Sequence, residues 1–292
     1  MSKTFKEQFV EALENGITHK AIYLAQFMKD EINEPYDYRS PLVWAKKYGN
    51  EKVIKALSDM RAVEVVDKEG MGKELLKILD AEDADKIDKK RAIELIKDGA
   101  NIEKKDKFGN TALIKASSRR GCLDVVKTLI SRGAKVDEKN NHDYTALIKA
   151  SEYGLVEVVK ALLDAGAKVD EKDNGGGTAL IKASWCGRLD VVKTLISRGA
   201  KINEKNNDGE TALIWASRYG HVEVVKALLD AGADVTITNN DGKTAIDCTF
   251  RDEIKKLLNE AMECKNERAK KATQETSENG VWSKIGKLFG RE

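Results

Sequence analysis

The sequence is poor in proline, cysteine and aromatic residues. It contains 2 prolines and 4 cysteines in 292 residues, and aromatic residues make up 6%. The cysteines stand singly, with no second cysteine and no histidine at ligand spacing, which excludes a disulfide framework and a zinc site and favours a reducing compartment. These residues are Cys122, Cys186, Cys248 and Cys264.

Long apolar runs are also absent. No stretch approaches the roughly 20 apolar residues that cross a bilayer. The first residues, MSKTFKEQFVEALENG, carry a charge every few positions and show no apolar core of a signal peptide. We therefore expect a soluble, cytoplasmic protein, and delivery into another cell fits the same features.

Charge of one sign does not dominate either. The 51 basic and 49 acidic residues leave a net charge of +2, and acidic residues interleave the basic ones throughout. This balance argues against nucleic acid as a partner. A charged content of 34% beside an apolar content of 41% is typical of a thin, well-solvated folded chain.

A repeat dominates the sequence. The motif Thr-Ala-Leu/Ile begins at five threonines that are 34, 33, 33 and 33 residues apart: Thr111, Thr145, Thr178, Thr211 and Thr244. The units share the frame T-A-L-I-x-A-S-x-x-G-x-x-x-V-V-K-x-L-[LI]-x-x-G-A. Repeats of this length are supersecondary units that bury their apolar faces by stacking on their neighbours.

The frame predicts a helix pair in each unit. Thr111 is expected to cap a short first helix through its hydroxyl, and Gly121 to end that helix with a positive φ. Val125, Val126 and Leu129 then recur at the spacing of one helical face, which predicts a second, amphipathic helix. Segments ahead of the motif, such as Asp106 to Gly109 and Asn207 to Gly209, predict tight turns at the hairpin tips.

With this period and these glycines, the chain resembles the ankyrin repeat family. The resemblance implies an all-α solenoid of stacked helix pairs with hairpin-like tips, about eight units including the caps. We expect these parts: 1–39, an N-terminal capping helix pair; 40–110, two divergent repeats; 111–243, four regular repeats; 244–264, a shortened C-terminal cap; 265–279, a flexible linker; and 280–292, an amphipathic basic segment.

The resemblance also implies where a partner binds. Partners of this family contact the hairpin tips and the concave face formed by the first helices. The residue after T-A-L-I is lysine in three regular units and tryptophan in the fourth, which gives a ladder of lysines flanked by tryptophans. The two residues before the inter-helix glycine vary most between otherwise similar units. The candidate partner-binding residues are Trp44, Lys47, Tyr48, Lys115, Arg119, Arg120, Lys149, Glu152, Tyr153, Lys182, Trp185, Trp215, Arg218 and Tyr219. Taken singly, each of these residues is also an ordinary choice that merely solvates the groove.

No enzyme chemistry is visible in the sequence. The three histidines, His19, His142 and His221, stand without Ser, Asp or Cys partners at a telling spacing. The glycine-rich stretch 174–177 lacks the Lys-Ser/Thr of a phosphate-binding loop and is better explained as a turn. We expect no catalytic site, no metal and no cofactor.

The C-terminal residues form a separate candidate contact. Trp282, Ile285, Leu288 and Phe289 fall on one helical face, with Lys284, Lys287 and Arg291 elsewhere. Such a segment could dock on a partner, on the repeats themselves or, more weakly, on a membrane.

These observations favour a monomeric adaptor that binds a protein of unknown identity. An inhibitor, such as an immunity protein or an injected effector that blocks an enzyme, would have the same sequence features. A peripheral membrane tether that acts through residues 280–292 is the third possibility.

Overall fold

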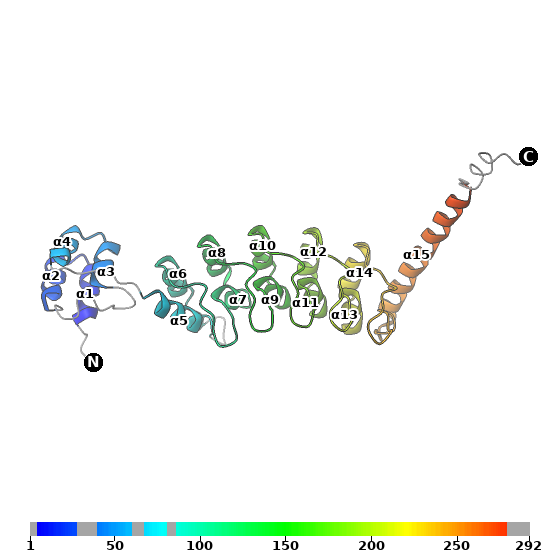
Figure 1. Ribbon diagram of the computed structural model, residues 1–292, viewed down its shortest axis with the longest axis horizontal. Helices are drawn as coiled ribbons and strands as arrows, with labels where there is room; N and C mark the ends of the chain where they lie inside the picture. Colours follow the sequence, from blue (N-terminus) through cyan, green and yellow to red (C-terminus); the bar gives the residue numbers. More distant parts are fainter. Residues whose placement is uncertain (1–4, 28–39, 60–66, 81–85, 279–292) are drawn as a thin grey trace, which may run out of the picture. The chain divides into compact units, whose positions relative to one another are not determined.

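The computed structural model describes residues 5–27, 40–59, 67–80 and 86–278, and within these ranges every regular element is a helix (Figure 1). The prediction of an all-α stack of helix pairs is confirmed. The chain divides into two units. Unit 1 contains residues 1–106 and 131–134, and unit 2 contains residues 107–130 and 135–292.

Unit 1 begins with two helix pairs around one apolar core. Helices α1 and α2 pack on each other, as do α3 and α4, and Phe9, Leu13, Leu24 and Leu57 are almost fully buried between them. Proline at the first position of α3 suits a helix start, where its missing N–H would have no helical partner. The helices are α1 Phe5–Glu14, α2 Thr18–Phe27, α3 Pro41–Lys47 and α4 Glu51–Asp59.

The next pair in unit 1 is α5, Lys68–Ile78, and α6, Lys89–Lys97. Aspartate caps both helices: Asp67 accepts a hydrogen bond from Gly70 N, and Asp88 accepts one from Arg91 N. Arg91 also binds Glu74 on α5 at 2.9 Å. The extra residues expected in this repeat fall between α5 and α6, and 81–85 lie outside the described residues.

Unit 2 contains the regular repeats. The first helices pack side by side in one layer and the second helices in another (Figure 1). The first helices are α7 Ala112–Ala116, α9 Ala146–Tyr153, α11 Ala179–Trp185 and α13 Ala212–Tyr219. The second helices are α8 Leu123–Ser131, α10 Val156–Asp164, α12 Leu189–Ser197 and α14 Val222–Asp230.

The repeat frame explains these boundaries. In each regular repeat the threonine hydroxyl accepts a hydrogen bond from the N–H three residues on; for Thr145 and Ile148 the distance is 3.2 Å. The glycine after each first helix has a positive φ, as expected from the sequence: Gly121, Gly154, Gly187 and Gly220. Apolar side chains of both helices, such as Leu147 and Leu162 in the second regular repeat, fill the core between the layers.

A ladder of asparagines joins the hairpin tips. Asn207 donates from its backbone N–H to the carbonyl of Gly175, and from its side-chain amide to the carbonyl of Asn174, both at 2.9 Å. Each rung links one repeat to the one before it. The rungs are Asn141, Asn174, Asn207 and Asn240.

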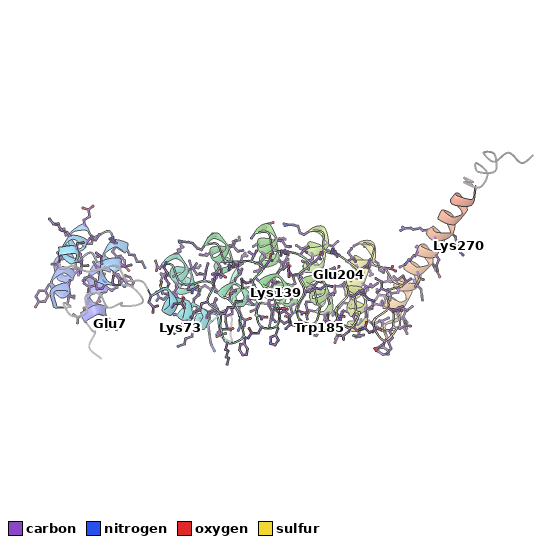
Figure 2. All side chains as sticks on the ribbon, in the orientation of Figure 1. Glu7, Lys73, Lys139, Trp185, Glu204 and Lys270 are labelled. Atoms are coloured by element: carbon purple, nitrogen blue, oxygen red, sulfur yellow. The ribbon has the colours of Figure 1, made fainter. Side chains whose placement is uncertain are left out.

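A second ladder consists of ion pairs between consecutive repeats. Lys139 lies 2.9 Å from Glu171, and Lys172 lies 2.7 Å from Glu204; Lys139 and Glu204 are labelled in Figure 2. The hydrogen bonds from these lysines hold the pKa of Glu171 and of Glu204 below the usual value, against a smaller opposing effect of burial. Neighbouring units are thus coupled by polar contacts as well as by the core.

The last unit departs from the frame. After Thr244 the chain makes a turn in place of a first helix and then enters α15, Asp252–Glu278, whose Ile254 and Leu258 are buried. The structure differs from the flexible linker expected at 265–279, because α15 continues to Glu278. Its residues are mostly Ala, Glu, Lys and Arg, which favour helix even when exposed. The amphipathic segment 280–292 lies outside the described residues.

Candidate functional site

The position after T-A-L-I carries Lys115, Lys149, Lys182 and Trp215 in successive repeats of unit 2. The sequence placed these lysines among the candidate partner contacts, but Lys115 is only 7% exposed, and Lys149 and Lys182 are partly buried. The close packing of the first helices covers the lysine stems. This position therefore presents little free charge to a partner.

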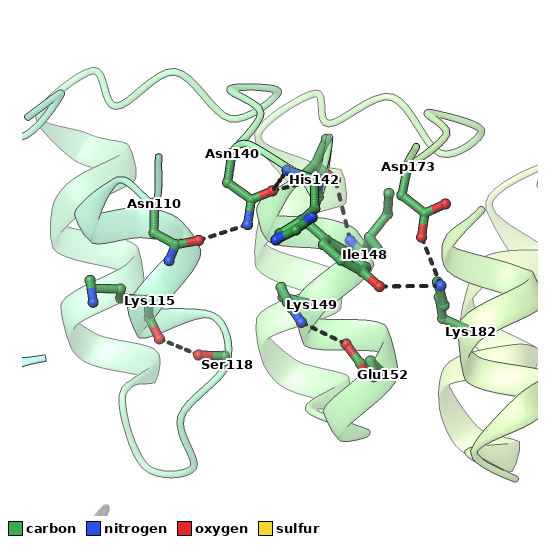
Figure 3. Close-up of polar contacts among 12 residues, drawn as sticks. Asn110, Lys115, Ser118, Asn140, His142, Ile148, Lys149, Glu152, Asp173 and Lys182 are labelled. Carbon is green, nitrogen blue, oxygen red and sulfur yellow. Dashed lines mark hydrogen bonds and ion pairs between the residues drawn. The ribbon is translucent and has the colours of Figure 1, made fainter. Parts of the chain in front are cut away.

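Lys149 and Lys182 are held by carboxylates (Figure 3). Lys149 lies 3.0 Å from Glu152, and Lys182 lies 2.7 Å from Asp173. Tyr144 lies between them, with its ring 4.1 Å from Lys149 Nζ and its hydroxyl 3.3 Å from Lys182 Nζ. Burial lowers the pKa of Lys182, but the hydrogen bond and charge of Asp173 outweigh this and raise it. Both lysines are thus already paired with a carboxylate of the chain.

Three aromatic side chains from two adjacent repeats meet further along the same face. The ring of Trp185, at the end of α11 (Figure 2), lies 5.5 Å from that of Trp215 and 6.3 Å from that of Tyr219. Trp215 and Tyr219 stack at 5.7 Å. We call Trp185, Trp215 and Tyr219 the aromatic cluster. Such offset arrangements are favourable and fix the rings in place.

Charged groups surround the aromatic cluster but are paired within the chain. The guanidinium of Arg218 lies 5.0 Å above the ring of Trp215 and binds Glu210 at 2.5 Å. Lys182 lies 5.7 Å from the ring of Trp185. The indole Nε1 of Trp215 is buried and donates no hydrogen bond within the described residues. The cluster therefore offers apolar ring surface in a nearly neutral setting.

The exposed part of this surface lies where the first helices end. Tyr153 is 46% exposed and Tyr219 is 50% exposed, and Arg120 is exposed as well. Arg119 and Glu152 are partly buried, Glu152 through its pairing with Lys149. Among the candidate residues of unit 2, the ones open to a partner are thus Tyr153, Tyr219 and Arg120.

His221 has a structural role that the sequence did not reveal. Its Nε2 lies 2.9 Å from the carbonyl oxygen of Trp185 in the preceding repeat. The ring passes so close to Gly187 that a Cβ there would lie 2.6 Å from Nδ1. Gly187 is needed for its φ of +66° and also for this approach. His221 directly follows the inter-helix glycine. Arg188 has the same position one repeat earlier and likewise bonds to the preceding repeat, by donating to the carbonyl of Glu152. This shared position is the feature of the sequence that could have revealed the role of His221.

The early candidates form a separate group in unit 1. The rings of Trp44 and Tyr48 stack at 5.8 Å, and Lys47 Nζ lies 4.9 Å from the Trp44 ring. Trp44 is only 5% exposed, so it is a core residue and not the exposed contact that the sequence suggested. Lys47 is exposed, and Tyr48 is partly so.

Neither a metal site nor a membrane span is found among the described residues. No group of His, Cys, Asp and Glu there is arranged to hold a metal ion, and no described helix is both long and apolar enough to cross a bilayer. Cys186 is partly buried, and burial raises the pKa of its thiol, which disfavours the reactive thiolate.

The structure is that of a helical repeat protein whose distinctive surface is the aromatic cluster on its stacked first helices. A profile of three ankyrin repeats matches residues 83–173, 121–206, 167–240 and 183–270. The chain belongs to the ankyrin repeat family, as its sequence predicted. Repeats of this family generally serve protein–protein interaction. No curated protein matches the sequence.

Proposed function

We propose that this chain is a non-enzymatic adaptor that binds a protein partner through the first-helix face of unit 2 and the adjoining hairpin tips. The observation that carries the proposal is the aromatic cluster. Its three side chains occupy variable positions of an otherwise uniform repeat, and Tyr219 is half exposed although it is large and apolar. Partly exposed, preorganised aromatic side chains are typical of binding hot spots.

The internal ion pairs support the same proposal. Lys149, Lys182 and Arg218 are held in place by carboxylates, so little side-chain entropy remains to be lost when a partner binds. A rigid face with few free charges suits a partner that buries apolar side chains. An inhibitor or effector that blocks an enzyme would use the same surface, and it differs from an adaptor only in its consequence.

Affinity capture from cell extract tests the proposal. We expect the Tyr153→Ala/Tyr219→Ala variant to lose the specific partner that the intact chain retains, because both side chains are exposed and their truncation spares the core. Tyr23→Ala is the matched control, since Tyr23 is a 58% exposed tyrosine of unit 1. Equal capture by all three chains would contradict the proposal.

One observation favours a second contact, at the C-terminus. Helix α15 continues for 20 residues beyond the buried Leu258, or roughly 30 Å of helix, before the amphipathic segment 280–292 begins. Residues 263–271 of α15 are exposed; Lys270 is labelled in Figure 2. A tether to a membrane or to a second partner fits this spacing. Deletion of 280–292 should then abolish sedimentation with anionic vesicles, and unchanged sedimentation would rule out the membrane tether.

A further inference from the structure

The ends of the first helices in unit 2 form a continuous edge. Arg120, Tyr153 and Arg188 line one shallow depression, and His221 and Arg251 line the next; Gly187 and Leu189 belong to both. We call this surface, from Arg120 to Arg251, the turn edge. After Arg120, three consecutive repeats contribute Tyr153, Arg188 and His221, and the last unit contributes Arg251. The turn edge therefore extends well past the aromatic cluster.

The arginines of the turn edge differ from the cations of the first-helix face. Lys149, Lys182 and Arg218 are each in an ion pair, whereas no ion pair in the described part of the chain involves Arg120, Arg188 or Arg251. The Arg188 side chain donates a hydrogen bond to the Glu152 carbonyl oxygen, which carries no formal charge. The turn edge thus keeps positive charge available to a partner.

The acidic residues beside the turn edge are mostly compensated. Glu157 and Glu223, in the first turns of α10 and α14, each lie 2.9 Å from the lysine three residues on. Asp190 follows Arg188 closely in the chain and offsets part of its charge. Asp252 and Glu253, in the first turn of α15, lie 3.9 Å from Lys255 and 3.5 Å from Lys226, respectively. Asp124, in the first turn of α8, and Asp190 are in no ion pair of the described residues. The three unpaired arginines therefore outnumber the two unpaired carboxylates.

Apolar groups alternate with these arginines. Tyr153 and Tyr219 are about half exposed, and Phe250, directly before Arg251, is 93% exposed. Val156, Leu189 and Val222 are partly exposed in the depressions. Phe250 lies in the shortened last unit and therefore falls outside the repeat frame.

The spacing of the repeats selects the conformation of a ligand. Packed helices lie about 10 Å apart, so Val156, Leu189 and Val222, which occupy the same position in three consecutive repeats, recur at about that interval along the turn edge. Seven residues of an α-helix rise about 10.5 Å and return close to the same face. Three residues of a strand also cover about 10 Å, but they end on the opposite face. A helix with apolar residues every seven positions therefore matches the edge, and a strand does not.

We propose that the turn edge binds an acidic amphipathic helix of the partner, with apolar residues at heptad spacing against Val156, Leu189 and Val222 and carboxylates against Arg120, Arg188 and Arg251. This inference rests on the proposed adaptor function and names the partner's chemistry. The unpaired arginines require the partner helix to be negatively charged. The spacing of the repeats requires its apolar residues to recur every seven positions.

A display library of helical peptides tests the inference. Each peptide has leucine at every seventh position, and the flanking positions encode Glu or Lys at equal frequency. We expect the full chain to enrich Glu over Lys several-fold among bound peptides. The Arg120→Glu/Arg251→Glu variant should reverse this preference or weaken binding of the selected peptides at least tenfold. Lys127→Glu/Lys193→Glu, two exposed lysines on second helices, is the charge-matched control and should behave as the intact chain.

Three outcomes overturn the inference: recovery of no helical binder, enrichment of Lys, or a Glu preference that the arginine reversal leaves unchanged. A single-stranded oligothymidylate is tested in parallel with the peptides. If the chain binds the oligothymidylate through these arginines and does not bind the peptides, the ligand is a nucleic acid and the inference is also wrong. If cellular capture depends on Tyr153 and Tyr219 but not on Arg120 and Arg251, the adaptor function stands and this inference alone fails.

Discussion

Lys182 Nζ lies 2.7 Å from a carboxylate oxygen of Asp173, whose side chain is only 3% exposed. The other oxygen of Asp173 accepts hydrogen bonds from the backbone N–H groups of Gly175 and Gly177, at 3.0 and 2.8 Å. Through Asp173, helix α11 is tied to the hairpin tip that precedes it. The geometry of the first-helix face thus depends on a buried ion pair.

We predict that Lys182→Met lowers the free energy of unfolding by about 3 kcal/mol, because it leaves the buried carboxylate of Asp173 without its cation. Urea denaturation measures this difference. Lys149→Met is the matched control, since its partner Glu152 is 23% exposed, and it should cost less than about 1 kcal/mol. Equal losses in the two variants would show that burial does not set the strength of these pairs.

The serine of the repeat frame provides a second test. The following serines are 0% exposed, and their hydroxyls have no hydrogen-bond partner among the residues that the structure describes: Ser117, Ser151, Ser184 and Ser217. Removing such a hydroxyl relieves an uncompensated desolvation cost, so Ser151→Ala should raise the free energy of unfolding by up to about 1 kcal/mol. Thr145→Ala, which removes a helix cap in the same repeat, should lower it by about 1 kcal/mol. Thermal denaturation compares the two, and a clear loss on Ser151→Ala would contradict the assignment.

The asparagine ladder predicts local coupling between repeats. Asn207→Ala removes the side-chain bond to the Asn174 carbonyl and should cost about 1 kcal/mol. Amide hydrogen exchange should speed up at the tips on both sides of the missing rung. Asp208→Ala, at the exposed neighbouring position, serves as the control. Identical exchange in the two variants would mean that the ladder adds nothing to the packing.

The attachment of α15 should depend on pH. Hydrogen bonds from Lys265 and then from Thr236 lower the pKa of Asp234 from 3.8 to about 2. Because the folded-state pKa is lowered, this contribution to stability is present above about pH 4 and is lost as the pH falls toward 2. Both side chains are at least a third exposed, so the contribution is below about 1 kcal/mol.

Hydrogen exchange of α15 near Cys264, measured between pH 5 and pH 2 and corrected for the intrinsic rate, tests this attachment. Exchange should accelerate at the acidic end in the intact chain. Asp234→Asn, which has no carboxyl group to titrate, should show the faster exchange throughout. If both chains show the same dependence of exchange on pH, the Asp234 carboxylate does not contribute to the attachment of α15.

Most of the fold could be predicted from the repeat frame, which indicates where the helices of each unit begin and end. Thr145 as a cap and Gly154 as a left-handed helix end are local features, so the sequence alone was enough to assign them. Asn207 looked equally local, as a turn residue. Its bonds to the preceding tip depend on the offset between stacked units, which no single repeat determines.

Exposure was the harder quantity to predict. Lys115 and Trp44 occupy positions that suggested a groove-facing contact, yet both are buried, because a long or flat side chain can lie between packed helices. Phe250 lies in a unit that departs from the frame, so the alignment gave no reason to notice it. The polarity of residues 265–278 suggested a linker, whereas their helix propensity was the stronger factor.

Site-specific photo-crosslinking tests the central claim, that a partner binds the first-helix face of unit 2. A benzoylphenylalanine residue would replace Tyr219 in one chain and the exposed Lys193 of second helix α12 in another. We expect a covalent adduct with one specific protein from position 219 and no adduct from position 193. Adducts from position 193 alone would place the partner on the second helices and contradict the account.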